Sequence, residues 1–226
     1  VDRLARMKTA APDFRIFWDN AYGVHHIYAE EKIKDIFAAC EAAGNPDRVI
    51  YFFSTSKITF PGAGISMVAT SPANREEILK HMTVQTIGHD KLNQLRTVRY
   101  LKDAEGVRQH MRRLAQELKP KFDIVLDTLE RELGGTGLAS WTKPKGGYFV
   151  ALDTLDGCAA TVEMAKEAGV KLTGAGATFP YKKDPRDRNI RIAPTYPTLD
   201  ELRAAMELLC VCVKRAGVEK LLKEKH

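Results

Sequence analysis

The hydrophobic positions in the first half of the chain form short apolar runs separated by stretches with helical spacing. The runs, which have the length of buried strands, occupy residues 14–18, 49–53 and 65–69. Between the first two runs apolar side chains recur at helical spacing around Ile36 and Cys40, and Ser71-Pro72 opens a further helix. Strands and helices in alternation, without tight hairpins, are typical of an α/β domain.

The second half has a different pattern. Apolar side chains recur every three or four residues over 107–133, which predicts one helix of about 30 residues with a buried stripe. Pro120 lies inside it and is expected to bend or break it. Shorter elements are expected to follow, with strands at 139–142, 147–152 and 189–193, and helices over 159–168 and from the capping box 198–201 onward. Since this half is α+β in style, we place a domain boundary between residues 102 and 103.

Composition narrows the function classes. Of 226 residues, 44% are hydrophobic and 28% are charged, as in an ordinary globular protein, and no apolar run approaches the roughly 20 residues of a membrane span. The net charge is +6, but basic and acidic residues are interleaved without a basic stripe, so we expect no nucleic-acid or membrane partner. The four cysteines are separated or lie on different helix faces, which favours reduced thiols and a cytoplasmic setting. No histidine has metal-ligand spacing, and we expect no metal site.

One lysine is notable for its surroundings. Lys57 follows the 49–53 strand and lies between the hydroxyls of 54–56 and a Gly/Pro turn at 60–64. A partly buried lysine at such a place can lose its proton near neutral pH and attack a carbonyl carbon. Taken alone, this position is weak evidence for a reactive lysine, because most lysines just beyond a strand are solvated loop residues.

Asp19 and Tyr22 follow the 14–18 strand in the same way. Ligands of open α/β sheets bind beyond the carboxyl ends of the strands. If the two strands are neighbours, Asp19, Tyr22 and Lys57 converge on one edge of the sheet. Taken singly, Asp19 could equally cap a turn and Tyr22 could equally be a core aromatic residue.

The combination resembles the fold-type I pyridoxal-phosphate aminotransferases. The amino-acid sequences of residues 19–26, 54–64 and 93–100 most resemble those of a bacterial subgroup of aspartate aminotransferases. That subgroup is related to the aminotransferase-like domains of some winged-helix regulators. The resemblance covers essentially the whole chain. It implies the carboxyl-terminal part of that fold: a mostly parallel large-domain sheet with helices over 1–102, then a linking helix and a small α+β domain over 103–226. It also implies a homodimer.

The resemblance implies a role for each matching residue. Lys57 would form a Schiff base with the aldehyde of pyridoxal 5'-phosphate and then move the α-proton of the substrate. Asp19 would keep the pyridine nitrogen of the cofactor protonated, and Tyr22 would donate its hydroxyl to the phenolate oxygen. Ser54 and Ser56 would hydrogen-bond the phosphate group.

Substrate binding is implied for an arginine. Arg191, in the expected strand 189–193, matches the family's arginine that binds the α-carboxylate through a planar two-point contact, with Arg188 as its nearby competitor. A dicarboxylate substrate needs a second cation, for which Lys91, Arg96 and Arg99 are candidates.

The sequence departs from the family in two places. Most relatives have a phosphate-binding arginine seven or eight residues after the lysine, where this chain has Gly64 and Ile65. Backbone amides of the 62–64 turn are our hypothetical replacement, as an anion nest. The family's amino-terminal half also has no counterpart before Val1, so we expect a longer gene product and a fragment that is cofactor-poor and unstable alone, with part of its sheet uncovered.

The expected activity is transamination, with L-aspartate as amino donor and 2-oxoglutarate as acceptor. Two alternatives remain open. One is an aminotransferase-like ligand-sensing domain of a transcriptional regulator, and the other is a different pyridoxal-phosphate reaction, such as decarboxylation, on the same scaffold. The site residues do not decide between enzyme and sensor, because both classes keep them.

Overall fold

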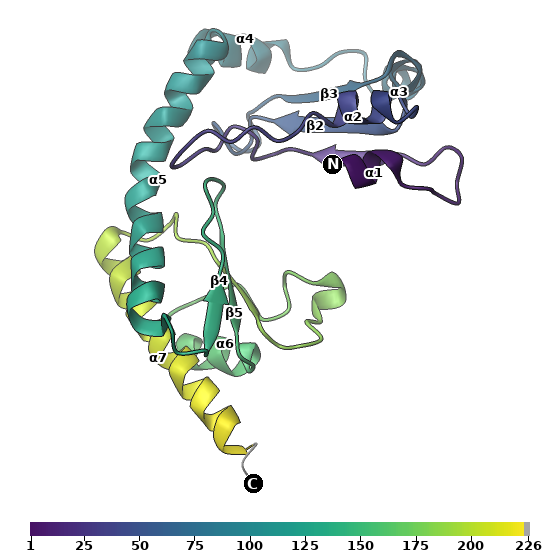
Figure 1. The fold of residues 1–226 in the computed structure, drawn as a ribbon. Coiled ribbons are helices and arrows are strands. Elements are labelled where there is room, and N and C mark those ends of the chain that lie inside the picture. The colour runs from purple at the N-terminus through teal and green to yellow at the C-terminus, as the bar shows by residue number, and fades with distance from the viewer. Residues whose placement is uncertain (224–226) are drawn as a thin grey trace. The chain divides into compact units, whose positions relative to one another are not determined.

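The computed structural model describes residues 1–223 as two compact units (Figure 1). The first unit comprises residues 1–26 and 30–112, and the second comprises 27–29 together with the chain from 113 onward. The division between them falls inside the long helix α5 (Ala104–Leu133), whereas the change of sequence pattern lies near residue 103. Because the boundary between the two units lies within one continuous helix, no change of secondary structure marks it in the sequence.

The first unit is built on a three-stranded sheet in the order β1-β2-β3. Its strands are β1 (Ile16–Asp19), β2 (Val49–Ser54) and β3 (Ser66–Thr70). β1 pairs with β2 in parallel, whereas β3 pairs with β2 antiparallel. The α/β class is as expected, but only one of these two strand pairs is parallel. The reason is the short Lys57 connection, since a return to a parallel strand needs a longer crossover.

Two short helices cover one face of this sheet. They are α1 (Asp2–Arg6) and α2 (Ile36–Ala42), and their apolar side chains pack with Trp18, Val49 and Tyr51. The register places Phe17, Phe52 and Val68 on the opposite face, where Phe17 is 71% exposed and Val68 50% exposed.

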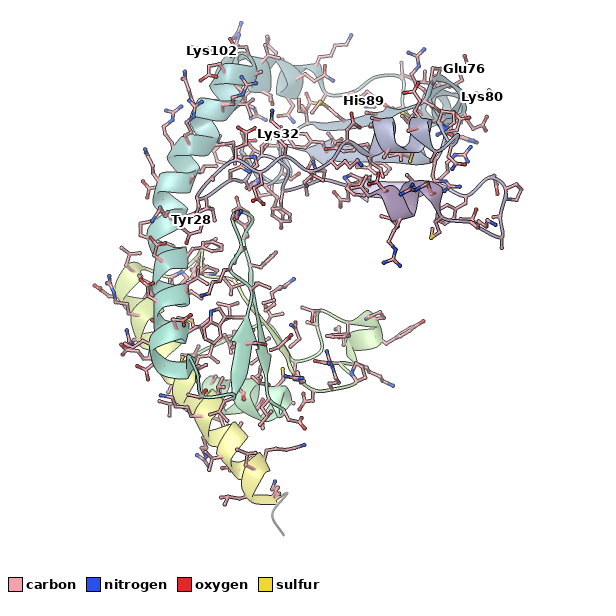
Figure 2. All side chains as sticks on the ribbon, viewed as in Figure 1. Tyr28, Lys32, Glu76, Lys80, His89 and Lys102 are labelled. Carbon is pink, nitrogen blue, oxygen red and sulfur yellow. The ribbon has the colours of Figure 1, made fainter. Side chains whose placement is uncertain are left out.

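Two longer helices follow the sheet in sequence. They are α3 (Pro72–Gln85), which Ser71 caps through its side chain, and α4 (Lys91–Leu101), which Asp90 caps in the same way. The polar side chains of Glu76 and Lys80 on α3 are exposed, as is that of Lys102 just after α4; Figure 2 labels all three. This distribution matches the mixed surface that the interleaved charges predict.

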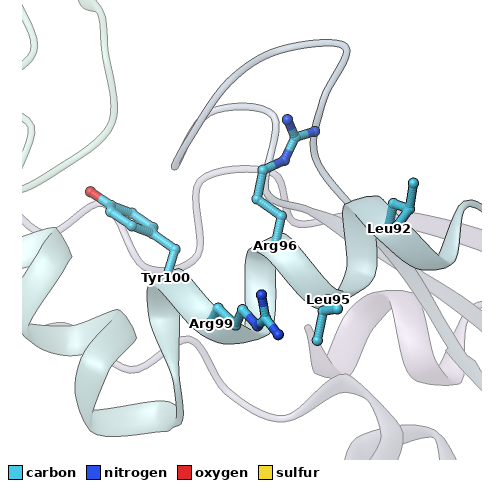
Figure 3. Close-up of a pocket in the computed structure, with 5 residues that line it drawn as sticks. All are labelled: Leu92, Leu95, Arg96, Arg99 and Tyr100. Carbon is cyan, nitrogen blue, oxygen red and sulfur yellow. The ribbon is translucent and has the colours of Figure 1, made fainter.

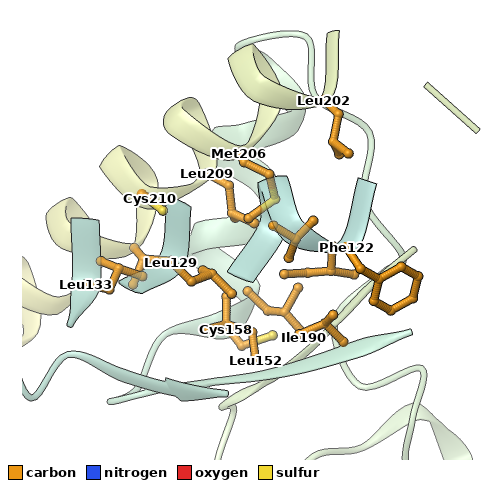
Figure 4. Close-up of a cluster of buried hydrophobic side chains, with 14 of the residues drawn as sticks. Phe122, Leu129, Leu133, Leu152, Cys158, Ile190, Leu202, Met206, Leu209 and Cys210 are labelled. Carbon is orange, nitrogen blue, oxygen red and sulfur yellow. The ribbon is translucent and has the colours of Figure 1, made fainter. Parts of the chain in front are cut away.

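The second unit packs helices on one face of another three-stranded sheet. Its elements are the second part of α5, β4 (Ala139–Trp141), β5 (Val150–Thr154), α6 (Cys158–Glu167), the 3-10 turn η1 (Pro180–Lys182), β6 (Asn189–Ile192) and α7 (Leu199–Lys223). The sheet has the order β4-β5-β6 and both pairs are antiparallel. Figure 4 shows the core, in which Phe122 and Leu129 of α5, Ile190 of β6 and Leu209 of α7 are essentially inaccessible to solvent.

Local signals locate these elements well. The capping box forms as predicted: the backbone N–H of Thr198 donates to Glu201 Oε2 at 2.9 Å, and the Glu201 N–H donates to Thr198 Oγ1 at 3.3 Å. Pro120, by contrast, does not break α5, which continues from Ala104 to Leu133. The buried apolar stripe on its carboxyl-terminal side, including Phe122, compensates for the hydrogen bond that a proline cannot donate.

No helix within residues 1–223 combines the length and the apolarity needed to cross a bilayer. Cys40, Cys158, Cys210 and Cys212 are all buried free thiols. Burial raises the pKa of Cys158 to about 12 and that of Cys210 to about 11, which keeps both in the unreactive thiol form.

Candidate active site

The carboxyl ends of β1 and β2 meet at one edge of the first sheet. Their parallel register pairs Asp19 with Phe52, and the N–H of Asn20 donates to the Phe52 carbonyl at 2.9 Å. β2 continues only to Ser54 before the Lys57 turn begins. The two strands are therefore neighbours, as the sequence argument required, and Asp19 lies at the same sheet edge as the start of that turn.

Lys57 lies on a compact turn closed by Thr55. The backbone N–H groups of Ile58 and Thr59 both donate to the Thr55 carbonyl at 2.9 Å. Thr55 is itself buried, and its Oγ1 accepts from the N–H of Ile65 at 2.9 Å. Thr55 thus joins the beginning of the connection between β2 and β3, which contains Lys57, to its end at Ile65.

Gly64 fits against this threonine because it has no side chain. A Cβ atom at Gly64 would lie 2.4 Å from Thr55 Oγ1, well inside van der Waals contact. The Gly64 carbonyl accepts a hydrogen bond from Nδ2 of Asn93 on α4, at 2.6 Å. The glycine at this position is required by packing around Thr55.

Two histidines hold the carbonyl groups at the lysine itself. Nε2 of His25 lies 2.9 Å from the Lys57 carbonyl oxygen, and Nε2 of His110 lies 2.7 Å from that of Ile58. A carbonyl oxygen can only accept, so each Nε2 carries the proton. Burial is the main cause that lowers the pKa of His25, which favours its neutral form.

The exposure of the candidate residues differs from the expectation for the lysine. Lys57 and Asp19 are exposed, whereas Tyr22, Ser54 and Ser56 are half-buried. The partial burial considered for Lys57 from its place after a strand is not found in this chain. The N–H of Ser56 approaches the Ser54 hydroxyl at 3.4 Å, which brings both hydroxyl-bearing residues to the start of the turn.

The glycine turn has part of the geometry of an anion nest. Gly62 has φ +77°, a left-handed conformation that favours glycine. The N–H of Ala63, however, donates to the Phe60 carbonyl at 3.2 Å. One of the amides that would form the nest is therefore engaged within the turn.

Arg191 and Arg188 have different surroundings in the second unit. The guanidinium carbon of Arg191 lies 4.6 Å from the ring centre of Phe149, and its buried Nε has no hydrogen-bond partner among residues 1–223. Nε of Arg188 instead donates to the Thr154 carbonyl at 2.6 Å. A buried, unsatisfied guanidinium nitrogen is costly unless a ligand accepts from it. This difference favours Arg191 as the carboxylate-binding residue.

The candidates for a second cation lie on or beside a shallow pocket of α4. Figure 3 shows its lining residues, Leu92, Leu95, Arg96, Arg99 and Tyr100, with the two guanidinium groups pointing in different directions. Arg96 donates a hydrogen bond to the side chain of Asn93, the residue that holds Gly64. Arg96 is thus connected to the lysine turn through one intervening side chain.

Comparison with known proteins decides the family. A family model described as aspartate amino-transferase matches residues 1–225. The chain belongs to the aspartate aminotransferase family. The aspartate aminotransferase of Corynebacterium glutamicum is 50% identical over 219 residues, which are 96% of this chain and 51% of that protein.

Solved structures of the family agree. The crystal structure of an aspartate transaminase from the same organism has a TM-score of 0.93 and 48% identity, over 97% of this chain and 52% of that one. The α-aminoadipate aminotransferase LysN of Thermus thermophilus, complexed with N-(5'-phosphopyridoxyl)-L-leucine, shares the fold at a TM-score of 0.72 and 22% identity, over 89% and 50%. The chain spans about half the length of these relatives. The resemblance to the family and the expected fold class are confirmed.

Three residues that contact the turn containing Lys57 were not predicted as part of the candidate site. They are His25, Asn93 and His110, which bond the carbonyl groups of Lys57, Gly64 and Ile58. Each contact joins positions far apart in sequence, so no spacing rule indicates it. The signal that could have suggested two of them is their place in the segments that carry the family resemblance, His25 in 19–26 and Asn93 in 93–100.

Proposed function

We propose that the protein carrying this chain is a pyridoxal-phosphate-dependent aminotransferase that transfers the amino group of L-aspartate to 2-oxoglutarate. The observation that carries the proposal is the parallel register of β1 and β2, which places Asp19 at the sheet edge where the Lys57 turn begins. Family membership over the whole chain supports it, as does the name of the relative that is 50% identical.

The residues present fit the proposed cofactor. An exposed lysine, a carboxylate at a strand end and the two half-buried serines supply a nucleophilic amine, an anionic partner for a pyridinium and hydroxyls for a phosphate. When bound, pyridoxal phosphate supplies an electron sink that stabilises negative charge at the substrate α-carbon.

The chain's own side chains perform the remaining steps. Lys57 would hold the cofactor through Nζ and would carry the proton to and from the substrate α-carbon. Asp19 keeps the ring nitrogen protonated through its negative charge. Tyr22 directs its hydroxyl to the phenolate oxygen, and Ser54 and Ser56 bind the phosphate.

Arg191 binds the α-carboxylate of the substrate. Its planar guanidinium offers two parallel donors, which fix the carboxylate orientation as well as its charge. Its position over Phe149 limits the directions that the guanidinium can take. The full-length gene product is proposed to act as a homodimer.

A half-reaction tests the proposal. The full-length gene product loaded with pyridoxal phosphate is mixed with L-aspartate alone, and conversion to the pyridoxamine form is followed by absorbance. Aspartate-dependent conversion, reversed by 2-oxoglutarate, is expected. Binding of aspartate without conversion would instead support a ligand-sensing domain, and carbon dioxide release would support decarboxylation.

A further inference from the structure

His25 lies between two of the residues proposed to face the cofactor. Its backbone N–H donates to the Tyr22 carbonyl at 3.0 Å, and its ring meets the Tyr22 ring edge-on at a centroid distance of 5.4 Å. On its other side, Nε2 lies 2.9 Å from the Lys57 carbonyl oxygen. A single side chain therefore contacts Tyr22 and the backbone of Lys57 at once.

The burial of His25 and its contact with Tyr22 hold its ring in one orientation and one tautomer. The residue is only 3% exposed, and a buried donor that loses its acceptor costs more free energy than the hydrogen bond itself contributes. Its Nε2–H donates to the Lys57 carbonyl, which fixes one tautomer of the neutral ring. The edge-on contact with Tyr22 restrains the plane of the same ring.

The turn is also held through the two residues that follow the lysine. Ile58 and Thr59 are bonded through their N–H groups to the Thr55 carbonyl, while the side chain of Lys57 is exposed. Rotation of the peptide unit after Lys57 would move the Cα–Cβ direction of the lysine. A hydrogen bond to that peptide's carbonyl opposes this rotation directly.

We propose that His25 is a positioning residue for Lys57: it fixes the backbone of the lysine relative to Tyr22, so that the amine and the tyrosine hydroxyl reach the same cofactor. This inference rests on the proposed function. It predicts that the His25 ring affects the linkage of Lys57 to pyridoxal phosphate without touching the cofactor.

The test compares two variants of the full-length gene product. His25→Leu removes the donor, whereas His25→Gln places an amide N–H near the position of Nε2. His89→Leu is the matched control, since His89 is an exposed histidine of the same unit. The first readout, made without cofactor, is hydrogen exchange at the Ile58 and Thr59 amides. The second is the equilibrium constant for pyridoxal-phosphate linkage, from absorbance titration.

The expected result is local. In His25→Leu, exchange at both turn amides rises about threefold to tenfold and the linkage constant falls by a similar factor, as the loss of one hydrogen bond implies. Exchange within the β2–β3 ladder stays unchanged, His25→Gln restores both readouts, and His89→Leu changes neither. Unchanged turn exchange and linkage in His25→Leu would overturn the inference, and so would failure of His25→Gln to restore them.

Two further arms keep the outcome unambiguous. If His25→Leu does not fold, His25→Asn replaces it, because its amide is one bond too short to reach the Lys57 carbonyl. Borohydride trapping of the wild-type protein shows which lysine is linked. A label elsewhere than Lys57 would refute the proposed function, whereas a label at Lys57 with unaffected His25 variants would refute the positioning role alone.

Discussion

The side chain of Asn93 donates a hydrogen bond of 2.6 Å to the carbonyl of Gly64, which joins helix α4 to the far end of the lysine connection. Asn93 is buried, and Gly64 is half-buried and packed against Thr55. The contact accounts for a buried polar residue on a helix whose apolar side chains are largely exposed.

Removal of the Asn93 donor should destabilise the turn. In Asn93→Leu the Gly64 carbonyl loses its partner, and we expect the free energy of unfolding to fall by about 1–3 kcal/mol. Chemical denaturation of the full-length gene product measures this, with the exposed neighbour Gln94→Leu as control. Equal stability of Asn93→Leu and Gln94→Leu would show that the bond contributes nothing.

The glycine turn is expected to respond differently at its two glycines. Gly64→Ala places a Cβ atom 2.4 Å from Thr55 Oγ1 and should displace the Ile65 hydrogen bond, which lowers both stability and pyridoxal-phosphate affinity. At Gly62 no atom lies within 4 Å of the added Cβ, so Gly62→Ala costs only the strain of its positive φ, about 1–2 kcal/mol.

A β-branched residue at Gly62 tests the anion-nest hypothesis. Gly62→Val should weaken phosphate binding if the 62–64 amides replace the arginine that most relatives have after the lysine. Titration with pyridoxal phosphate and with pyridoxal separates the phosphate contribution from the rest. An equal loss for both ligands would contradict the nest.

The position of Arg191 predicts a defect in substrate binding. Arg191→Lys keeps the charge but loses the planar two-point contact, and we expect KM for aspartate to rise about tenfold or more, with unchanged pyridoxal-phosphate affinity. Arg188→Lys is the matched control, because Arg188 is bonded to the Thr154 carbonyl. A larger effect on KM at Arg188 than at Arg191 would reverse the assignment.

His25 predicts a pH dependence of stability. Its pKa is lowered in the folded protein, first by burial and further by the nearby charges of His26 and Lys57, so the unfolded chain binds the proton more tightly. Stability from the neutral ring is present above the unfolded value of about 6.5 and is lost as the pH falls toward the lower folded value. Denaturation at several pH values should show this loss, and His25→Gln should lack it.

Local sequence signals predicted most elements of the fold. The Thr198 capping box, the β2 run and the buried stripe of the long helix each depend on interactions between near neighbours. Helix α4 was not predicted, because two of its three buried residues, Asn93 and Thr97, are polar, while most of its apolar residues are exposed. A helix with a polar buried face does not have the apolar periodicity that such predictions use.

In the candidate site, the sequence allowed only those residues that lie at or just after the carboxyl ends of the parallel strands to be placed together. Asp19 and the residues from Ser54 to Lys57 could be placed together, because parallel strands bring their carboxyl ends to one edge. The carbonyl contacts of His25 and His110 depend on packing between distant segments, and the exposure of Lys57 depends on what surrounds the turn. Neither can be inferred from spacing.

Identification of the lysine that links to pyridoxal phosphate tests the proposed role of Lys57 directly. The full-length gene product is incubated with pyridoxal phosphate, reduced with borohydride, digested and mapped by mass spectrometry, with Lys57→Arg as control. We expect one phosphopyridoxyl label, on Lys57, and its loss in Lys57→Arg. A label on any other lysine, or one that persists in Lys57→Arg, would contradict it.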